Sequence, residues 1–171
     1  MTQYDHPDIL RVTERFVFFW KPPAPFGQWT DSPFSIEGVD YGCAEQLMMA
    51  EKARLFGDEA TRQQILDTPD PRLHRSLGRK VRGFSEKAWI ANREDIVYRG
   101  NIAKFSQNPT LLAALLETGD RTLVEASPYD RVWGIGLNST DLRAEDPAQW
   151  RGLNLLGKTL MRVRTALTTS G

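Results

Sequence analysis

The alternation of apolar and polar residues changes period several times along the chain, and each change predicts an element. Residues 15–20 (RFVFFW) form a continuous apolar run that predicts a short buried strand rich in aromatic residues. Residues 33–42 alternate weakly and predict a second extended segment that ends in a turn. Residues 121–126 (RTLVEA) predict a third strand, which leads directly into a glycine-containing loop.

Helical patterns occupy most of the remaining chain. The predicted helices cover residues 43–56, 58–66, a segment that opens at Pro71 behind Asp70, 85–105, a segment from Pro109 to Gly119, and 153–168. On the last helix we expect one buried face, made by Leu153, Leu156, Leu160, Val163 and Leu167. A polar loop is expected from the glycine-containing segment to about Arg151. The pattern therefore predicts an α+β fold, mainly helical with a few short strands, in a single domain over residues 1–171.

Composition and charge narrow the function classes. The chain has 22 Lys and Arg against 22 Asp and Glu, and this zero net charge argues against engagement of nucleic-acid backbone over the whole surface, although a local basic patch is compatible with it. Cys43 is the one cysteine of the sequence, so it has no partner for an internal disulfide. The sequence has only two histidines, His6 and His74, so we expect no metal site and no cofactor. No apolar run approaches the roughly 20 residues that span a bilayer, and the first ten residues lack a secretory leader. A cytoplasmic protein without a membrane partner is expected, and the pattern indicates no particular oligomeric state.

The helix over residues 43–56 carries an unusual stripe. Glu45, Met48, Met49 and Lys52 lie at positions i, i+3, i+4 and i+7, so they share one face. An acid and an amine therefore flank two apolar residues, about 10 Å apart along the axis. Two interpretations are open: both charged groups approach one ligand from either end, or both extend to solvent at the helix margins.

A basic segment follows at residues 77–83 (LGRKVRG), where Arg79, Lys80 and Arg82 lie between two glycines. Arg79 could hold a phosphate through two parallel hydrogen bonds, or the segment could be a solvated helix end whose cations complement the helix dipole. Trp89, at helical spacing, is either a core residue or a stacking platform.

The third candidate is the loop over residues 124–138 (VEASPYDRVWGIGLN). Its two glycines allow close approach of backbone N–H groups to a ligand, its acid could orient a hydroxyl or a water, and its aromatic rings could stack on a planar base. These residues are Gly134 and Gly136, Asp130, and Tyr129 and Trp133. The alternative is a tight turn plugged by Trp133. Asn154 lies at a helix start between two glycines, a place suited to anions.

Several ordered blocks resemble the NADAR domain, also called the YbiA-like family. Residues 100–138 are similar to the centre of that domain, and residues 44–56 (AEQLMMAEKARLF) are similar to its E-H-x-x-Q-A-x-K helix. The remaining blocks are LGR at 77–79, Trp89, AKF at 103–105 and GLNLLGKTLMRVR at 152–164. The resemblance covers about residues 16–167.

The resemblance implies an N-glycosidase. One branch of the family cleaves the base–ribose bond of phosphorylated riboflavin-pathway intermediates, and another removes ADP-ribose from guanine in nucleic acid. The expected substrate is thus a phosphorylated ribose, either ribose 5-phosphate or ADP-ribose, joined through nitrogen to a guanine-like aminopyrimidine or purine. The expected partner is a phosphorylated nucleotide-like small molecule or an ADP-ribosylated nucleic acid. A non-catalytic sensor of NAD or ADP-ribose is the alternative.

The same resemblance implies five functional positions, Glu45, Lys52, Trp89, Asp130 and Trp133, and the other candidates come from local sequence patterns. The expected catalytic residues are Glu45, Lys52 and Asp130, with Lys52 acting either by charge or through a Schiff base. The expected substrate-binding residues are Trp29, Arg79, Trp89, Ser127, Tyr129, Trp133, Gly134, Gly136 and Asn154. Two positions depart from the family pattern: Gln46 stands where the family usually has His, and Met49 where it often has Gln.

Overall fold

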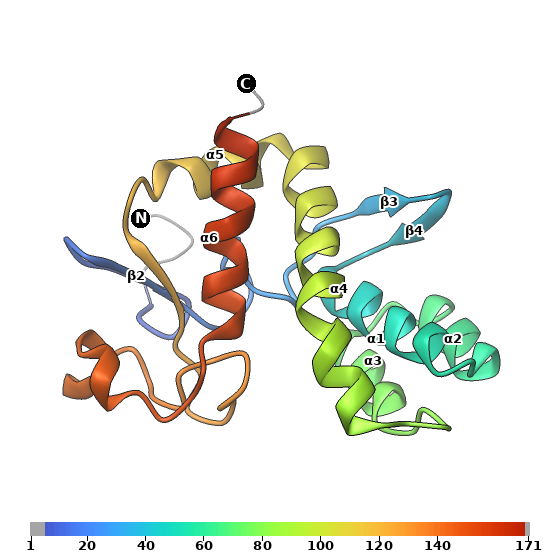
Figure 1. Ribbon diagram of the computed structural model, residues 1–171. Helices are drawn as coiled ribbons and strands as arrows, with labels where there is room; N and C mark the ends of the chain where they lie inside the picture. The colour runs from blue at the N-terminus through green and yellow to red at the C-terminus, as the bar shows by residue number, and fades with distance from the viewer. Residues whose placement is uncertain (1–5, 170–171) are drawn as a thin grey trace. The chain divides into compact units, whose positions relative to one another are not determined.

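Contacts along the chain divide it into two units, which the computed structural model describes over residues 6–169 (Figure 1). The first unit combines residues up to 30 with those from 109 onward, and the second contains residues 31–108. The described residues form six α-helices, five short strands and two short 3-10 helices. This confirms the predicted α+β class, whereas the single domain stays a prediction. The expectation about a secretory leader falls partly on residues 1–5, outside the described part of the chain.

The first unit is built on a three-stranded sheet with the order β1-β2-β5. Its strands are β1 (Leu10–Val12), β2 (Phe16–Phe19) and β5 (Thr122–Glu125). Strand β2 is antiparallel to β1 and parallel to β5, with Phe18 opposite Val124. All four residues of β2 are buried, which explains why its sequence is a continuous apolar run and confirms the strand predicted there.

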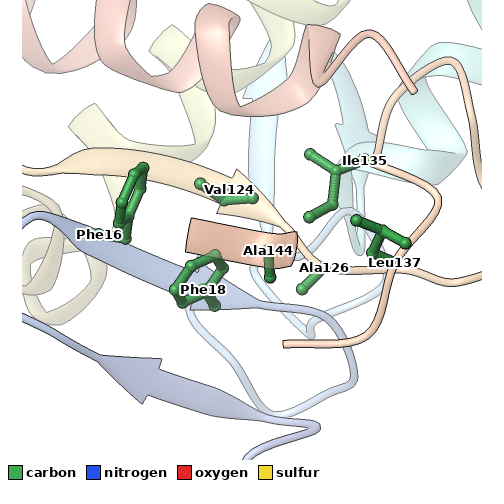
Figure 2. Packing of buried hydrophobic residues seen from close by; sticks show 7 residues of the cluster. All are labelled: Phe16, Phe18, Val124, Ala126, Ile135, Leu137 and Ala144. Atoms are coloured by element: carbon green, nitrogen blue, oxygen red, sulfur yellow. The ribbon is translucent and has the colours of Figure 1, made fainter. Parts of the chain in front are cut away.

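One hydrophobic cluster of the first unit lies on one face of this sheet. Its buried residues are Phe16, Phe18, Val124, Ala126, Ile135, Leu137 and Ala144 (Figure 2). Two of them, Ile135 and Leu137, come from the loop that carries Gly134 and Gly136. That loop is therefore anchored by its own apolar side chains on β2 and β5.

Three short elements of the first unit were not predicted. Strand β1 lies before the first predicted strand, in a segment where no element was predicted, and it exists because it pairs with the edge of β2. The 3-10 helices η1 (Leu142–Glu145) and η2 (Pro147–Gln149) lie inside the predicted loop. The side chains of Asp141 and Asp146 accept hydrogen bonds from the first turns of η1 and η2, at 2.9 and 3.1 Å. Single turns of this kind have no periodicity that a sequence pattern can reveal.

Helices α5 (Pro109–Glu117) and α6 (Leu155–Thr168) complete the first unit. The predicted start of α6 at Leu153 is wrong by two residues. Asn154 adopts a left-handed conformation with a φ of 52°, so the helix begins after it. Leu153 is consequently 52% exposed and does not join the buried face, on which Leu156, Leu160 and Val163 lie as expected and Leu167 lies partly buried.

The second unit contains a hairpin and four helices. These elements are β3 (Phe34–Ile36), β4 (Val39–Tyr41), α1 (Ala44–Leu55), α2 (Glu59–Leu66), α3 (Pro71–Gly78) and α4 (Glu86–Gln107). Asp58, Asp70 and Ser85 accept hydrogen bonds at the N-termini of α2, α3 and α4, respectively, as their positions predict. No helix that the structure describes, α4 included, is long and apolar enough to cross a membrane.

Helix α1 packs against α2, α3 and α4 (Figure 1). Glycines allow two of these contacts to be close. A Cβ atom on Gly78 of α3 would lie 2.0 Å from the Sδ atom of Met49, and one on Gly100 of α4 would lie 2.6 Å from the Cδ2 atom of Leu47. Most of α1 is therefore surrounded by other helices, and its acids Glu45 and Glu51 are buried.

The start of α6 provides a test of the first unit. A Cβ atom on Gly157 would lie 2.1 Å from the carbonyl oxygen of Leu123 and 2.4 Å from Nδ2 of Asn154. Because the first of these atoms belongs to strand backbone, we expect Gly157→Ala to cost about 3 kcal/mol and to lower Tm by roughly 6–12 °C in thermal unfolding. Gly42→Ala is the control, since its nearest neighbour would be 3.7 Å away. Equal Tm values for the two variants would contradict this packing.

Candidate active site

The stripe on α1 is buried to different depths along its length. Glu45 is only 5% exposed, Met48 and Met49 are buried, and Lys52 is half-buried. Glu45 therefore does not extend to solvent, as the alternative interpretation of the stripe required. Its place in the first turn of α1 is favourable for a carboxylate because the helix dipole is positive there.

The amino group of Lys52 lies beside two aromatic rings. Its Nζ atom is 4.6 Å from the ring centre of Phe84 and 5.5 Å from that of Trp89. Burial lowers the pKa of Lys52, and the positive charge of Arg79 lowers it further, whereas the negative charge of Glu45 opposes both. The structure thus groups three predicted site residues of the second unit, Glu45, Arg79 and Trp89, around the amine of Lys52, and it adds Phe84, which the sequence pattern did not single out.

The segment that presents Arg79 and Phe84 is fixed by Asp58. One carboxylate oxygen of Asp58 accepts the backbone N–H of Arg82 at 2.9 Å, and the other accepts the Arg82 guanidinium at 3.0 Å. Thr61 donates its hydroxyl to the same carboxylate at 2.7 Å. The hydrogen bonds from Arg82 hold the pKa of Asp58 well below its usual range. Arg82 therefore has a structural partner, whereas no ion pair of Arg79 is found among the described residues.

Gln46, the first departure from the family pattern, joins α1 to α2. Its Nε2 atom donates to the carbonyl groups of Ile65, Leu66 and Thr68 at 3.0–3.2 Å, and its Oε1 atom accepts the N–H of Gly42 at 2.8 Å. Carbonyl groups at a helix C-terminus have no partner within the helix, so a side-chain amide satisfies them well. Gln46 therefore has a structural role in this chain.

Met49, the second departure, also faces a neighbouring helix. Its side chain contacts Gly78, the last residue of α3, at the close contact described above. Arg79 follows Gly78 directly, so the contact with Met49 lies one residue before Arg79. Both departures thus affect how α1 packs against its neighbouring helices.

Cys43, His74 and Lys104 form a separate set of buried titratable groups in the second unit. The Sγ atom of Cys43 lies 3.9 Å from Nδ1 of His74. Burial raises the pKa of Cys43 to about 11 and lowers that of Lys104 to about 7. Cys43 therefore favours the protonated thiol. In the part of the chain that the structure describes, no group of three or more His, Cys, Asp or Glu side chains could hold a metal ion.

In the first unit, the loop over residues 126–138 is held by its own side chains. Oδ1 of Asp130 accepts the N–H groups of Val132 and Trp133 at 2.9 and 2.8 Å. Oγ of Ser127 accepts those of Tyr129 and Asp130 at 3.3 and 3.2 Å. Ser127 and one oxygen of Asp130 are therefore used to shape the loop.

The backbone geometry of the loop requires glycine at both positions 134 and 136. Gly136 has a φ of 69°, and its N–H donates to the carbonyl oxygen of Asp130 at 3.1 Å. A Cβ atom on Gly134 would lie 2.9 Å from the carbonyl oxygens of both Asp130 and Glu125. The N–H of Gly136 is thus occupied within the loop, which weakens the case for its contact with a phosphate.

The remaining expected ligand residues are found in different environments. Tyr129 is 85% exposed, with its ring centre 5.8 Å from that of Trp20, and Trp29 and Trp133 are partly buried. Asn154 is buried, and its amide bonds to strand β5: Oδ1 accepts an N–H at 3.1 Å and Nδ2 donates to a carbonyl at 3.0 Å. The observed role of Asn154 is therefore to join the start of α6 to the sheet.

Comparison with known proteins agrees with this arrangement. The model of the family described as "NADAR domain" matches residues 18–168, which run through both units. The chain belongs to the NADAR domain family. The matched region contains every expected site residue, so the resemblance seen in the sequence blocks is confirmed.

Individual relatives are similar over most of this NADAR chain. N-glycosidase R617 of Acanthamoeba polyphaga mimivirus is 44% identical over 89% of the chain and 96% of its own length. The riboflavin biosynthesis protein PYRR, chloroplastic, of Zea mays is 30% identical over 94% of the chain but only 26% of its own length. The NMR structure of the E. coli protein YbiA superposes with a TM-score of 0.75 at 25% identity, covering 98% of this chain and 92% of that one. These findings confirm the YbiA-like fold and an enzyme of the N-glycosidase class.

The ion pair of Asp58 predicts a pH dependence of stability. Since the pKa of Asp58 is lowered on folding, its carboxylate stabilises the fold above the unfolded-state pKa of about 3.9, and this contribution is lost as the pH falls further. We expect Asp58→Asn to lower Tm at pH 7, and the difference from wild type to shrink between about pH 4 and pH 2. Thermal unfolding followed by circular dichroism measures both.

The matched control is Asp95→Asn, which removes an exposed i,i+4 ion pair with Arg99. It should change Tm much less than Asp58→Asn at pH 7. A difference between wild type and Asp58→Asn that persists unchanged at pH 2 would contradict the role given to this carboxylate.

Proposed function

We propose that this N-glycosidase cleaves the bond between a phosphorylated ribose and a guanine-like aminopyrimidine or purine base. The observation that carries the proposal is the group around Lys52: a buried carboxylate at one end of the stripe, a half-buried amine, an exposed guanidinium and an aromatic ring. These residues are Glu45, Lys52, Arg79 and Trp89. The relation to a protein named for riboflavin biosynthesis supports a substrate from that class of phosphorylated ribosides.

Lys52 supplies the nucleophile in this proposal. A lysine becomes nucleophilic when it is desolvated and lies near another cation, and Lys52 meets both conditions through its aromatic neighbours and Arg79. Its amine attacks the anomeric carbon as the bond to the base breaks, and the electron pair of that bond goes to the base nitrogen. The sugar ring then opens to give an imine on Lys52. Water adds to the imine and releases the sugar phosphate, so the overall reaction is a hydrolysis.

Glu45 has two roles in the proposal: it stabilises the developing positive charge of the sugar, and it transfers a proton. Positive charge develops at the anomeric carbon as the base leaves, and a nearby carboxylate stabilises it most where water is excluded. Glu45 also takes the proton that the attacking amine loses and gives it to the base nitrogen. Its burial suits both tasks, because a desolvated carboxylate interacts more strongly with a nearby positive charge.

Arg79 and Trp89 provide recognition. The exposed guanidinium of Arg79 offers the planar fork that binds a phosphate through two hydrogen bonds. The ring of Trp89 offers a flat apolar surface for the base or the ribose. Together they would bind a substrate that contains both a phosphate group and a planar base.

The loop of the first unit has separate proposed roles. Asp130 uses only Oδ1 in the bonds that shape the loop, and we assign Oδ2 to the activation of water. Trp29, Tyr129 and Trp133 are proposed as contacts for the base, with Ser127 and Gly134 supporting the loop. Asp130→Asn tests this assignment by itself: it should lower kcat in the base-release assay while thermal unfolding shows that the variant is folded.

The activity test uses two substrates, a phosphoribosylamino-pyrimidine and an oligonucleotide carrying ADP-ribosylated guanine, with mass detection of the released base. We expect Glu45→Gln to lower kcat by about 10²- to 10³-fold. Glu94→Gln, an exposed acid of α4, is the control and should keep full activity. Release from only one substrate identifies the attached sugar phosphate. Binding of ADP-ribose without release from either substrate would favour the sensor function instead.

Borohydride trapping tests the covalent step. Reduction during turnover should convert the imine to a stable secondary amine and add the mass of the opened sugar phosphate to Lys52. Lys52→Arg keeps the positive charge but cannot form the imine, so it should lose both the adduct and activity. An unlabelled Lys52 in a protein that still releases base would restrict this residue to an electrostatic role.

A further inference from the structure

Phe84 lies at the Lys52 group without belonging to any block that resembles the family. It precedes Ser85, the N-cap of α4, and follows Gly83, which has a φ of 73°. Its side chain is 47% exposed, while its ring centre lies 4.6 Å from the Nζ atom of Lys52. Exposure of a single aromatic residue is ordinary in proteins. What distinguishes Phe84 is its fixed position next to a half-buried amine.

Three features fix this position. The ring of Phe56, which follows Lys52 by one helical turn, packs against that of Phe84 with centres 5.3 Å apart at an interplanar angle of 64°. A Cβ atom on Gly83 would lie 3.3 Å from the carbonyl oxygen of Phe56, so the backbone here lies close to the end of α1. The bonds of Asp58 to Arg82 hold the preceding residue of the same segment.

We infer that Phe84 is a positioning residue, which holds the amino group of Lys52 beside Trp89 and keeps water away from it. The charged groups that act on this amine are Glu45 on its own helix and Arg79 after α3, and the Trp89 ring of α4 lies beside it. Glu45 favours the ammonium form, so shielding from water is needed to keep part of the amine uncharged. Phe84 supplies one wall of that shield, and Trp89 supplies the other.

The catalytic meaning of this inference rests on the proposed function, but its physical content does not. Without the ring, water reaches the amine, the ammonium form becomes more favourable, and the pKa of Lys52 rises toward that of an ordinary lysine. A rise of about one pH unit would leave roughly tenfold less free amine at neutral pH. The shield therefore determines how much nucleophile is available.

The test measures the titration of Lys52 directly. Competitive acetylation with acetic anhydride at a series of pH values, read by mass spectrometry, gives the midpoint for Lys52 and for the exposed Lys80 in the same molecule. We expect Phe84→Ala to raise the Lys52 midpoint by about one pH unit and to leave that of Lys80 unchanged. Phe84→Leu, which keeps an apolar group of similar bulk, should retain most of the low midpoint.

Ile90→Ala is the matched control, because Ile90 is also 47% exposed and lies on α4 of the same unit. Its Lys52 midpoint should equal that of wild type, and thermal unfolding should show all variants folded. An unchanged midpoint in Phe84→Ala overturns the inference whether or not the protein releases base, so failure here is distinct from failure of the proposed function. In the activity assay, a fall in kcat at pH 7 that recovers at higher pH supports positioning. A rise in KM alone would instead make Phe84 a contact for the substrate.

Discussion

Keeping a carboxylate and an amine away from water on helix α1 is the constraint on which the second unit depends. A buried charge without partners costs several kcal/mol, so each such group needs compensation from its surroundings. Lys52 obtains it from the charge of Glu45, while Arg79 and burial, to which the rings of Phe84 and Trp89 contribute, act in the opposite direction. The helices around α1 produce this burial, and they can approach closely because glycines stand at the contacts with Met49 and Leu47. The contacts that pack the helices around α1 therefore also bury Glu45 and Lys52.

In the first unit, the corresponding constraint is to hold a loop without regular secondary structure in one conformation. Ile135 and Leu137 of the loop pack into the hydrophobic cluster on the sheet (Figure 2). The side chains of Ser127 and Asp130 accept hydrogen bonds from backbone N–H groups of the same loop. The amide of Asn154 joins the next helix to strand β5. Such a loop loses little conformational freedom when a ligand binds, because its backbone is already ordered.

The parts of this structure that local chemistry determines could be predicted from the sequence. Helix caps at Asp70 and Ser85, the buried strand β2 and the stripe on α1 all follow from short-range patterns, and so did the candidates Glu45 and Lys52. Features that depend on tertiary contacts could not be found in this way. Strand β1 exists through its pairing, and the late start of α6 results from the bonds of Asn154 to a distant strand. Phe84 was missed because only its fixed place next to Lys52 makes it informative. The role of Gly136 changed for a similar reason, since its N–H has a partner inside the loop.

The most direct test of the central claim, that the group around Lys52 binds a sugar phosphate, is a titration of the tryptophan indole N–H resonances by NMR. The chain has five tryptophans, and Trp150 serves as an internal reference because its N–H donates to the carbonyl oxygen of Ala144 at 2.8 Å. Addition of ribose 5-phosphate should shift the Trp89 resonance in a saturable way, leave Trp150 in place, and have no such effect in Arg79→Ala. A Trp89 resonance that stays unchanged while phosphorus line broadening shows the ligand to be bound would contradict the account.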